Sequence, residues 1–166
     1  VDFVDLNNPR EIWGVGIGES TARPVEVPAR TASGQLRDAN NAHSVSGFAM
    51  VPAKQGDAVY WIDSQQREIN ITQLDSGTTK PLLNSQILRQ RNQGQSSSAG
   101  LNQPHSLAFD AKQNRIYWID NIGGSTMIQS MSIFDEEPPQ RIAFSAGVIS
   151  SIALDPLHNT IYWIDS

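Results

Sequence analysis

Three aspartates occupy the same position in three copies of one short sequence motif. Asp63, Asp120 and Asp165 close the strings VYWID, IYWID and IYWID. A carboxylate at such a place can bind calcium, or it can be buried while backbone N–H groups donate hydrogen bonds to it. Calcium requires a dense loop of oxygen ligands, which the residues around these strings do not supply. We therefore predict structural aspartates and no metal site.

Residue types that are typical of catalytic sites form no known pattern in this chain. There is no cysteine, which excludes disulfides, thiolate metal sites and cysteine nucleophiles. The sequence contains no HExxH, GxSxG, P-loop or GxGxxG string. His158 lies in an expected turn, whereas His43 and His105 each precede an expected strand, where a pH-sensitive contact could form. We therefore expect no catalytic residue and no cofactor in this segment.

The charge pattern narrows the classes of partner. The 12 Lys and Arg residues and 17 Asp and Glu residues give a net charge of −5, without long runs of one sign. Nucleic acids and anionic membranes are bound by basic patches, so neither is an expected partner. No apolar stretch approaches the ~18 residues of a membrane span, and no direct membrane insertion is expected.

This aromatic-acidic motif belongs to an internal repeat. All four tryptophans and all three tyrosines fall in its copies. The stretch from Ser106 to Asp120 aligns without a gap on the stretch from Ser151 to Asp165. The repeats start near residues 1, 47, 106 and 151. The positions that define the repeat are Trp13, Tyr60, Trp61, Asp63, Tyr117, Trp118, Asp120, Tyr162, Trp163 and Asp165.

The spacing of the repeat predicts an all-β fold. The tyrosine place falls at residues 12, 60, 117 and 162, which gives intervals of 48, 57 and 45 residues. Such a period suits a propeller blade of four antiparallel strands. Residues 68–74 alternate apolar and polar side chains like a half-buried strand, and the one helix-like stretch, 82–93, lacks a clean apolar face. We therefore predict a β-propeller of four-stranded antiparallel blades.

The order of the two aromatic residues in the motif has a consequence for packing. Adjacent residues of a strand point to opposite faces of the sheet. We expect Tyr60 to pack toward one neighbouring blade and Trp61 toward the other, and the same for Tyr117 and Trp118. The aspartate, two residues after the tryptophan, shares the tryptophan's face near the strand end.

These features resemble a known repeat. A strand ending in Asp, a turn, YWxD and a stretch such as EINITQLDSG are similar to the YWTD repeat, the class B repeat of low-density-lipoprotein-receptor relatives. Ile replaces the Thr of the motif in the three clear copies. The resemblance implies a six-bladed propeller in an extracellular or cell-surface protein, a receptor ectodomain or a secreted matrix protein, that binds a protein ligand. The Gln- and Ser-rich insertions are similar to those of Sevenless/Ros-type receptors, whose kinase lies elsewhere in the parent chain.

A second repeat class leaves an enzymatic alternative open. SLAFDAKQNRIY also resembles the NHL repeat, and related six-bladed propellers include lactonase-type hydrolases and lyases. Such enzymes hold a metal or polarise a substrate on the central rim. The binding module is the preferred hypothesis, because no catalytic pattern accompanies the repeat.

The length of the chain bears on how many blades it holds. A six-bladed ring at roughly 40–45 residues per blade needs about 250 residues. The 166 residues therefore correspond to about three blades of a partial propeller. An open arc would expose aromatic faces and strand edges, so we expect the remaining blades to come from the same protein or from a second chain.

The family topology implies where a ligand would bind. Loops after the YWxD strands and connections between blades share one face, which places residues 64–67 and 121–125 on a common rim. The candidate binding residues are Asn121, together with Arg89, Arg91 and His105 of the long insertion 84–105. A disordered surface loop is the alternative for this insertion and for the connection 29–46. The sequon that begins at Asn70 makes that residue a candidate glycosylation site.

Overall fold

The computed structural model describes residues 2–4, 12–14, 23–25, 45–51, 58–91, 101–135 and 137–166. Its strands form antiparallel sheets in which neighbouring strands follow one another in the chain. The first sheet contains β1 (Asp2–Val4), β2 (Ile12–Gly14) and β3 (Arg23–Val25), for which only the backbone is described. Trp13 pairs with Phe3 in this sheet, and His43 lies outside the described residues.

Two four-stranded sheets and a two-stranded sheet follow along the chain. This is the all-β architecture of four-stranded antiparallel blades that the repeat predicts. The second sheet contains β4 (Val45–Val51), β5 (Ala58–Asp63), β6 (Glu68–Gln73) and β7 (Thr79–Leu83) in that order. The third contains β8 (Pro104–Asp110), β9 (Arg115–Ile122), β10 (Ser125–Ser132) and β11 (Gln140–Ser145), and the fourth contains β12 (Ile149–Asp155) and β13 (Thr160–Asp165).

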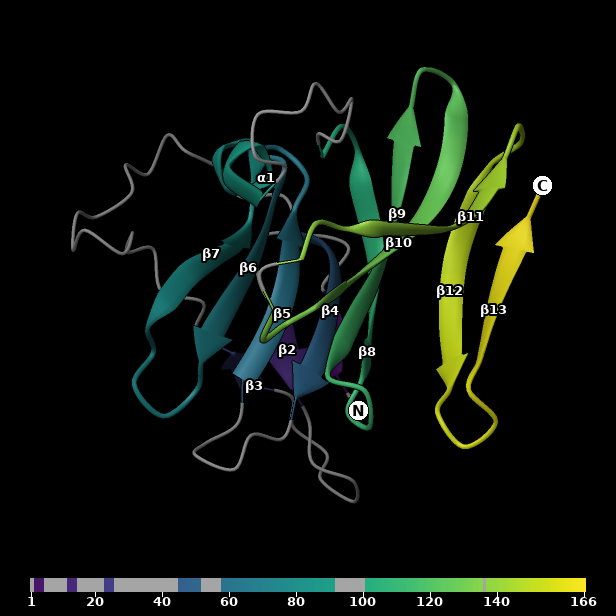
Figure 1. Cartoon of the computed structure of the whole chain (residues 1–166). Helices are drawn as coiled ribbons and strands as arrows, with labels where there is room; N and C mark the ends of the chain where they lie inside the picture. Colours follow the sequence, from purple (N-terminus) through teal and green to yellow (C-terminus); the bar gives the residue numbers. More distant parts are fainter. Residues whose placement is uncertain are drawn as a thin grey trace.

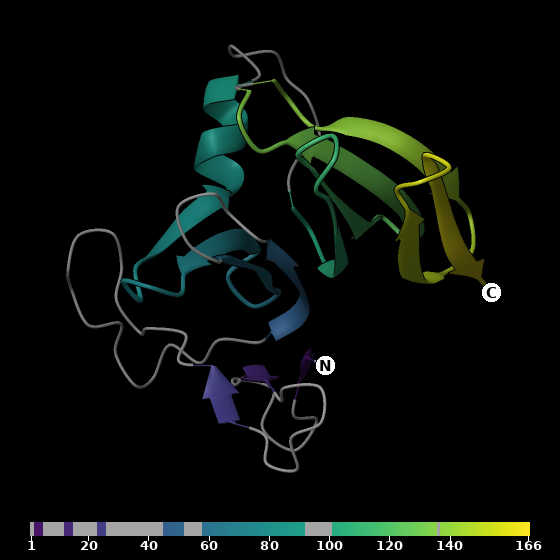
Figure 2. The ribbon, with the colours of Figure 1, turned by 90° about the horizontal axis from the view of Figure 1, so that it is seen from below.

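The sheets stand face to face, with their first strands together. Strand β4 packs against β8, and β8 packs against β12 (Figure 1). Figure 2 shows the second and third sheets diverging from the side where β4 and β8 meet. Gly47 permits this approach, because a Cβ atom there would lie 2.8 Å from the backbone nitrogen of Leu107. The sheets therefore meet closely along their first strands and spread apart toward their last.

The strand register repeats from one sheet to the next. The first strands of the last three sheets, β4, β8 and β12, each carry a β-bulge close to their beginning, where each pairs with the aspartate of the repeated motif. A bulge bends the strand and increases its local twist. The equivalent pairs are Val45 with Asp63, Pro104 with Asp120, and Ile149 with Asp165.

The core lies between the sheets, and the two aromatic residues of each copy of the motif point to opposite faces of their sheet. The Tyr60 ring stacks on Phe109 of the following sheet. Trp118 of that sheet points back into the same hydrophobic cluster, whereas Trp61 packs on the opposite face, and Tyr117 packs onward toward β12. Strand alternation thus places Tyr60 and Tyr117 against the following sheet, and Trp118 against the preceding one.

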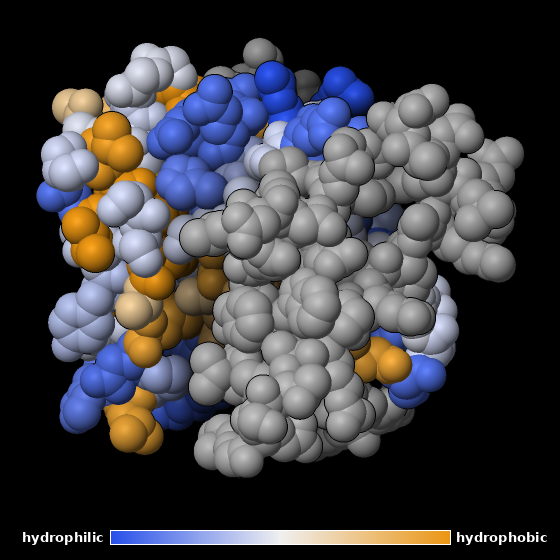
Figure 3. Space-filling model, turned by 180° about the vertical axis from the view of Figure 1, so that it is seen from behind, coloured by the Kyte–Doolittle hydropathy of each residue, from blue (hydrophilic) through white to orange (hydrophobic). Residues whose placement is uncertain are grey.

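The last sheet presents the same side chains to solvent. Tyr162 and Trp163 are 58% and 45% exposed, whereas the corresponding Trp61 and Trp118 are 2% and 0% exposed. The view from behind shows hydrophobic residues gathered on the side of the molecule that holds β12 and β13 (Figure 3). The tryptophans of the repeated motif are therefore buried in the second and third sheets, whereas both aromatic residues of its last copy are exposed to solvent.

The turns between the first two strands of the third and fourth sheets are also repeated. Asp110 Oδ1 accepts hydrogen bonds from the amides of the second and third residues that follow it, and Asp155 Oδ1 does the same. Asn114 and Asn159 end these turns at φ 53°, in the left-handed region that Asn tolerates. The aspartate and the asparagine of the repeat thus define one turn geometry.

A short helix interrupts the β-structure. Helix α1 (Ser85–Arg91) occupies the insertion, where the sequence favoured no helix because an apolar face was lacking. Asn84 Oδ1 accepts hydrogen bonds from the amides of Gln86 and Ile87, which caps the helix, and Leu88 is buried against β-strand residues. The cap and one buried leucine suffice for two turns. No described helix is long and apolar enough to cross a membrane.

Candidate functional site

Loops from three successive sheets surround a hollow at one edge of the molecule. This edge carries the β5–β6 turn, the β9–β10 hairpin and the segments that enter β8 and β12, and it is the upper edge in Figure 1. The hollow has a volume of about 370 Å³. Its described lining residues are Arg67, Asn102, Gln103, Asn121, Gly123, Gly124, Thr126 and Val148. We call these residues the rim hollow.

The buried Asp120 carboxylate holds one wall of the rim hollow in place. Its Oδ1 accepts hydrogen bonds from the amides of Asn102 and Gln103, at 3.1 and 2.8 Å. Burial raises the pKa of the Asp120 carboxyl, although hydrogen bonds from both amides and the nearby His105 act to lower it. The carboxylate therefore fixes the backbone of the wall and is not itself part of the lining.

His105 ties this wall to the next sheet. Its Nδ1 lies 3.1 Å from the Gln103 carbonyl oxygen, and its Nε2 lies 3.2 Å from the carbonyl oxygen of Ile149 in β12. The preceding junction has an equivalent bond, because Ser46 Oγ donates to the Pro104 carbonyl at 2.9 Å. His105 is therefore a junction residue beneath the rim hollow, and the pH-sensitive contact suggested by the sequence stays a prediction.

Arg67 is the charged residue among the described lining of the rim hollow. It is exposed at the end of the β5–β6 turn and adopts φ 55°. The residue at the same point of the β9–β10 hairpin is Gly124, at φ 84°. Glycine enters the left-handed region freely, whereas a long side chain does so at some energetic cost. Arg67 therefore has a modestly strained backbone conformation, and its guanidinium lies at the rim hollow.

The hairpin wall contributes polar groups that are held by hydrogen bonds. Thr126 Oγ1 lies 2.9 Å from Asn121 Oδ1 and 2.9 Å from the carbonyl oxygen of Gly147, which leads toward β12. Gly123 and Gly124 both have positive φ values, as a tight hairpin turn requires. The wall is therefore tied both across its own hairpin and to the following sheet.

A smaller hollow lies at the opposite edge. It has a volume of about 180 Å³ and opens between the third and fourth sheets, beside Tyr117 and Leu154. Its two aspartates, Asp110 and Asp155, are occupied by turn hydrogen bonds. Within the described ranges, no group of three or more His, Cys, Asp or Glu side chains is placed to hold a metal ion.

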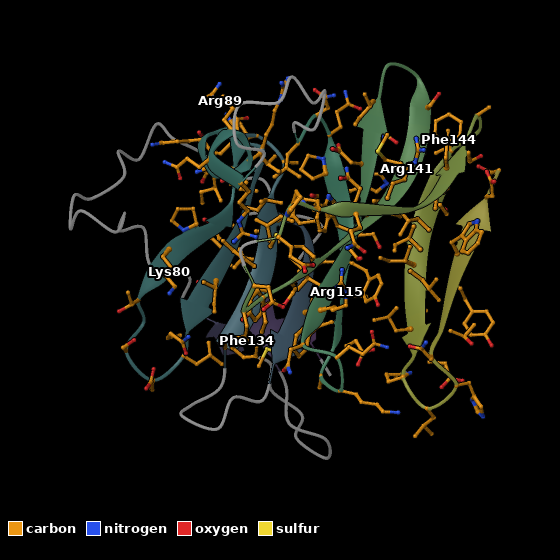
Figure 4. The ribbon with its side chains drawn as sticks, viewed as in Figure 1. Lys80, Arg89, Arg115, Phe134, Arg141 and Phe144 are labelled. Atoms are coloured by element: carbon orange, nitrogen blue, oxygen red, sulfur yellow. The ribbon has the colours of Figure 1, made fainter. Side chains whose placement is uncertain are left out.

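The structure places the sequence-predicted binding residues at different sites. Asn121 lines the rim hollow, and His105 lies beneath it. Arg89 projects from α1 at the upper edge in Figure 4, outside the described lining of the hollow. Arg91 points into the fold, where its Nη1 lies 2.7 Å from Met131 Sδ and 3.3 Å from the Glu137 carbonyl oxygen. Arg91 therefore links α1 to the third sheet, and the roles of Arg89, Arg91 and His105 in ligand binding stay a prediction.

The predicted glycosylation site is not accessible in the folded chain. Asn70 lies in β6 opposite Trp61 and is 1% exposed. A glycan attached to its Nδ2 would have to occupy the packed interior, so the sequon is not usable in this fold. A strand that is buried on this face cannot be recognised from a three-residue motif alone.

Several lining residues of the rim hollow were not singled out by sequence reasoning. Arg67 was included only as the end of a turn, and Gln103 and Asn102 only as part of a connection. Thr126 and Val148 carried no signal, because they come near Arg67 only through the stacking of the sheets. The sequence could predict part of the lining only through the rule that loops following equivalent strands lie on one face of a propeller.

Comparison with known proteins addresses the fold. No protein-family model matches the chain, and no curated protein matches its sequence. A chain from a crystal structure of a nidogen/laminin complex superposes with a TM-score of 0.65 over 93% of this chain, at 17% identity. The fold is that of a partial β-propeller. This propeller segment spans about half of the nidogen/laminin chain, 48% of its length.

A second solved structure is similar at a lower level. It is a putative 6-phosphogluconolactonase from Bacteroides uniformis, which superposes with a TM-score of 0.44 at 15% identity. The superposition covers 95% of the propeller segment and 48% of the lactonase chain. A similarity of this size carries no argument about activity.

Proposed function

We propose that this propeller segment is a non-catalytic module that binds a protein ligand at the rim hollow. The observation that carries the proposal is the convergence of loops from three successive sheets on one polar, concave surface. Loops on a rigid scaffold are where recognition tends to reside. The hydrogen bonds of Asp120, His105 and Thr126 limit movement of the walls, and this preorganisation favours binding.

The proposal includes an extracellular or cell-surface location. The YWTD-like repeat supports a receptor ectodomain or a matrix protein, and the nidogen/laminin structure is a precedent for a propeller of this form in a protein complex. The described lining residues offer amide, hydroxyl and guanidinium groups without a paired acid and base. A binding role therefore has more support than the lactonase-type alternative.

A second part of the proposal concerns the open face of the last sheet. Tyr162 and Ile164 lie on the face of β13 turned away from the third sheet and are 58% and 62% exposed, whereas the matching Tyr60 and Ile62 of β5 are buried. We propose that a further propeller blade, from the same protein or a second chain, covers this face. Such a partner would bury the side chains as Phe109 and Leu107 bury Tyr60 at the preceding junction.

The ligand-binding proposal can be tested with a panel of purified receptor ectodomains and matrix proteins, with laminin included. Surface plasmon resonance would compare the unchanged protein with Val148→Trp, which fills the rim hollow from an exposed position. Leu157→Trp is the matched control, because Leu157 is exposed in a turn at the opposite edge.

We expect a saturable ligand whose affinity falls at least about tenfold with Val148→Trp and stays unchanged with Leu157→Trp. A ligand that binds both variants equally well would contradict binding at the rim hollow. A panel without any saturable ligand would count against the proposal as a whole.

A further inference from the structure

We propose that the rim hollow recognises an acidic side chain of its protein ligand, with Arg67 as the group that binds the carboxylate. The inference rests on the proposed function and names the ligand chemistry of the same site. It depends on which charges face the hollow, which charges are turned away from it, and how firmly its walls are held.

The first step concerns the sign of charge at the surface of the hollow. Arg67 is the only ionisable residue among the described lining residues, and the others offer amide, hydroxyl, glycine or apolar groups. A guanidinium carries five N–H donors in a planar fork that matches the two oxygens of a carboxylate. No hydrogen bond or ion pair joins the Arg67 side chain to another described residue. Its donors therefore remain available to a ligand.

The second step concerns the nearby carboxylates. Asp120 lies behind the wall and is fully buried, and its carboxylate accepts hydrogen bonds from the amides of Asn102 and Gln103. Asp63, at the end of β5, is also buried. Its Oδ1 accepts hydrogen bonds from the amides of Gln65 and Gln66, in the β5–β6 turn that ends with Arg67. Both carboxylates hold loop backbone and face away from solvent, so neither competes directly for a ligand at the surface.

The third step concerns the backbone of Arg67. The left-handed conformation at φ 55° fixes where its side chain leaves the turn, and a glycine would relieve the strain. A strained residue that persists in a surface turn suggests a function for its side chain. The Asp63 hydrogen bonds immediately before it stabilise the turn that holds this conformation.

The fourth step concerns the amides around the guanidinium. Asn102, Gln103 and Asn121 each bring a carboxamide to the hollow, and a carboxamide can donate to a carboxylate as well as accept from a peptide N–H. Arg89 adds positive charge at the same upper edge without reaching the lining (Figure 4). An Asp or Glu within an extended segment of the ligand would therefore find a charged donor and neutral donors together.

The experiment uses the complete chain and blocked tripeptides as probes. Amide resonances of the ¹⁵N-labelled protein are followed while acetyl-Gly-Asp-Gly-amide is added, with the Asn and Lys tripeptides as controls. We expect saturating shifts at Gly123, Gly124 and Thr126 with the Asp peptide, at least about tenfold weaker binding of the Asn peptide, and no binding of the Lys peptide.

Variants then assign the effect to Arg67. Arg67→Gln should weaken binding of the Asp peptide at least about tenfold, and Arg67→Lys should weaken it less, because it keeps the charge but loses the planar fork. Lys112→Gln, in a turn at the opposite edge, is the matched control and should leave the affinity unchanged. Equal binding of the Asp and Asn peptides, tighter binding of the Lys peptide, or an unaltered Arg67→Gln variant would each overturn the inference.

Failure of this inference can be told apart from failure of the proposed function. A protein ligand that is lost with Val148→Trp but retained with Arg67→Gln would leave the binding site in place and remove the acidic specificity. Binding of the Asp peptide without any protein ligand at the hollow would support the chemistry and count against the module's proposed role.

Discussion

The Tyr60 ring lies on the Phe109 ring with centroids 5.8 Å apart and 7° between their planes. This stacked pair joins β5 of one sheet to β8 of the next. At the following junction Tyr117 faces Leu154 in place of a phenylalanine, and the 180 Å³ hollow opens beside them. The two junctions thus share a geometry and differ in how completely they are filled.

Phe109→Leu should lower the free energy of unfolding by about 1–2 kcal/mol, because it removes the aromatic pair and some buried area. The converse change, Leu154→Phe, should raise it by up to about 1 kcal/mol by filling the hollow beside Tyr117. Urea unfolding measures both. Opposite signs would show that the second hollow is a packing defect, whereas destabilisation by Leu154→Phe would mean that the hollow cannot accept the ring.

Trp118→Ala should lower the free energy of unfolding by about 3–5 kcal/mol, the range for deleting a large buried aromatic side chain. Trp163→Ala is the matched control in β13, where the equivalent tryptophan is 45% exposed, and it should lose no more than about 2 kcal/mol. Thermal or urea unfolding of both variants is the measurement. A loss below about 1 kcal/mol for Trp118→Ala would rule out its packing role between sheets.

The indole N–H groups of the two buried tryptophans are in different environments. Trp61 Nε1 donates to Thr72 Oγ1 at 3.0 Å, whereas Trp118 Nε1 is buried without a hydrogen bond, because Met131 stands at the place of Thr72. Trp61→Phe should therefore destabilise the chain by about 1–2 kcal/mol more than Trp118→Phe. Equal losses in urea unfolding would argue against a stabilising role for the Trp61–Thr72 bond.

Asp120→Asn should change how stability depends on pH. Burial raises the pKa of this carboxyl in the folded chain above its unfolded value, so the folded state binds more protons in the window between the two values. The free energy of unfolding therefore falls as pH rises through that window, and it rises again on acidification. Asparagine keeps an oxygen that can accept both amide hydrogen bonds but does not titrate.

The measurement is the stability difference between the unchanged protein and Asp120→Asn from about pH 7 to pH 4. It should move in favour of the unchanged protein on acidification, by no more than about 1.4 kcal/mol per pH unit. Asp75→Asn, at an exposed turn, is the control. A difference that is constant with pH, or that moves the other way, would show that the buried carboxylate is not penalised by desolvation.

The sequence by itself determined the repeating unit of this protein. Alternation within a strand is a local property, so the order Tyr60-Trp61 alone indicates that the two side chains pack toward different sheets. The spacing of the copies indicated four-stranded blades for the same reason, because the strands of each sheet follow one another in the chain. The aspartate turn at Asp110 is equally local, since its hydrogen bonds span two and three residues.

The tertiary structure decided the features that depend on how the sheets stack. Arg67 and Val148 are far apart in the chain and meet at the rim hollow only because β4, β8 and β12 lie side by side. The same stacking buries Asn70 and turns Arg91 inward, which no local pattern shows. Burial and the encounter of distant loops are set by packing between sheets, and packing is a property of the whole arrangement, whereas strand alternation is written residue by residue.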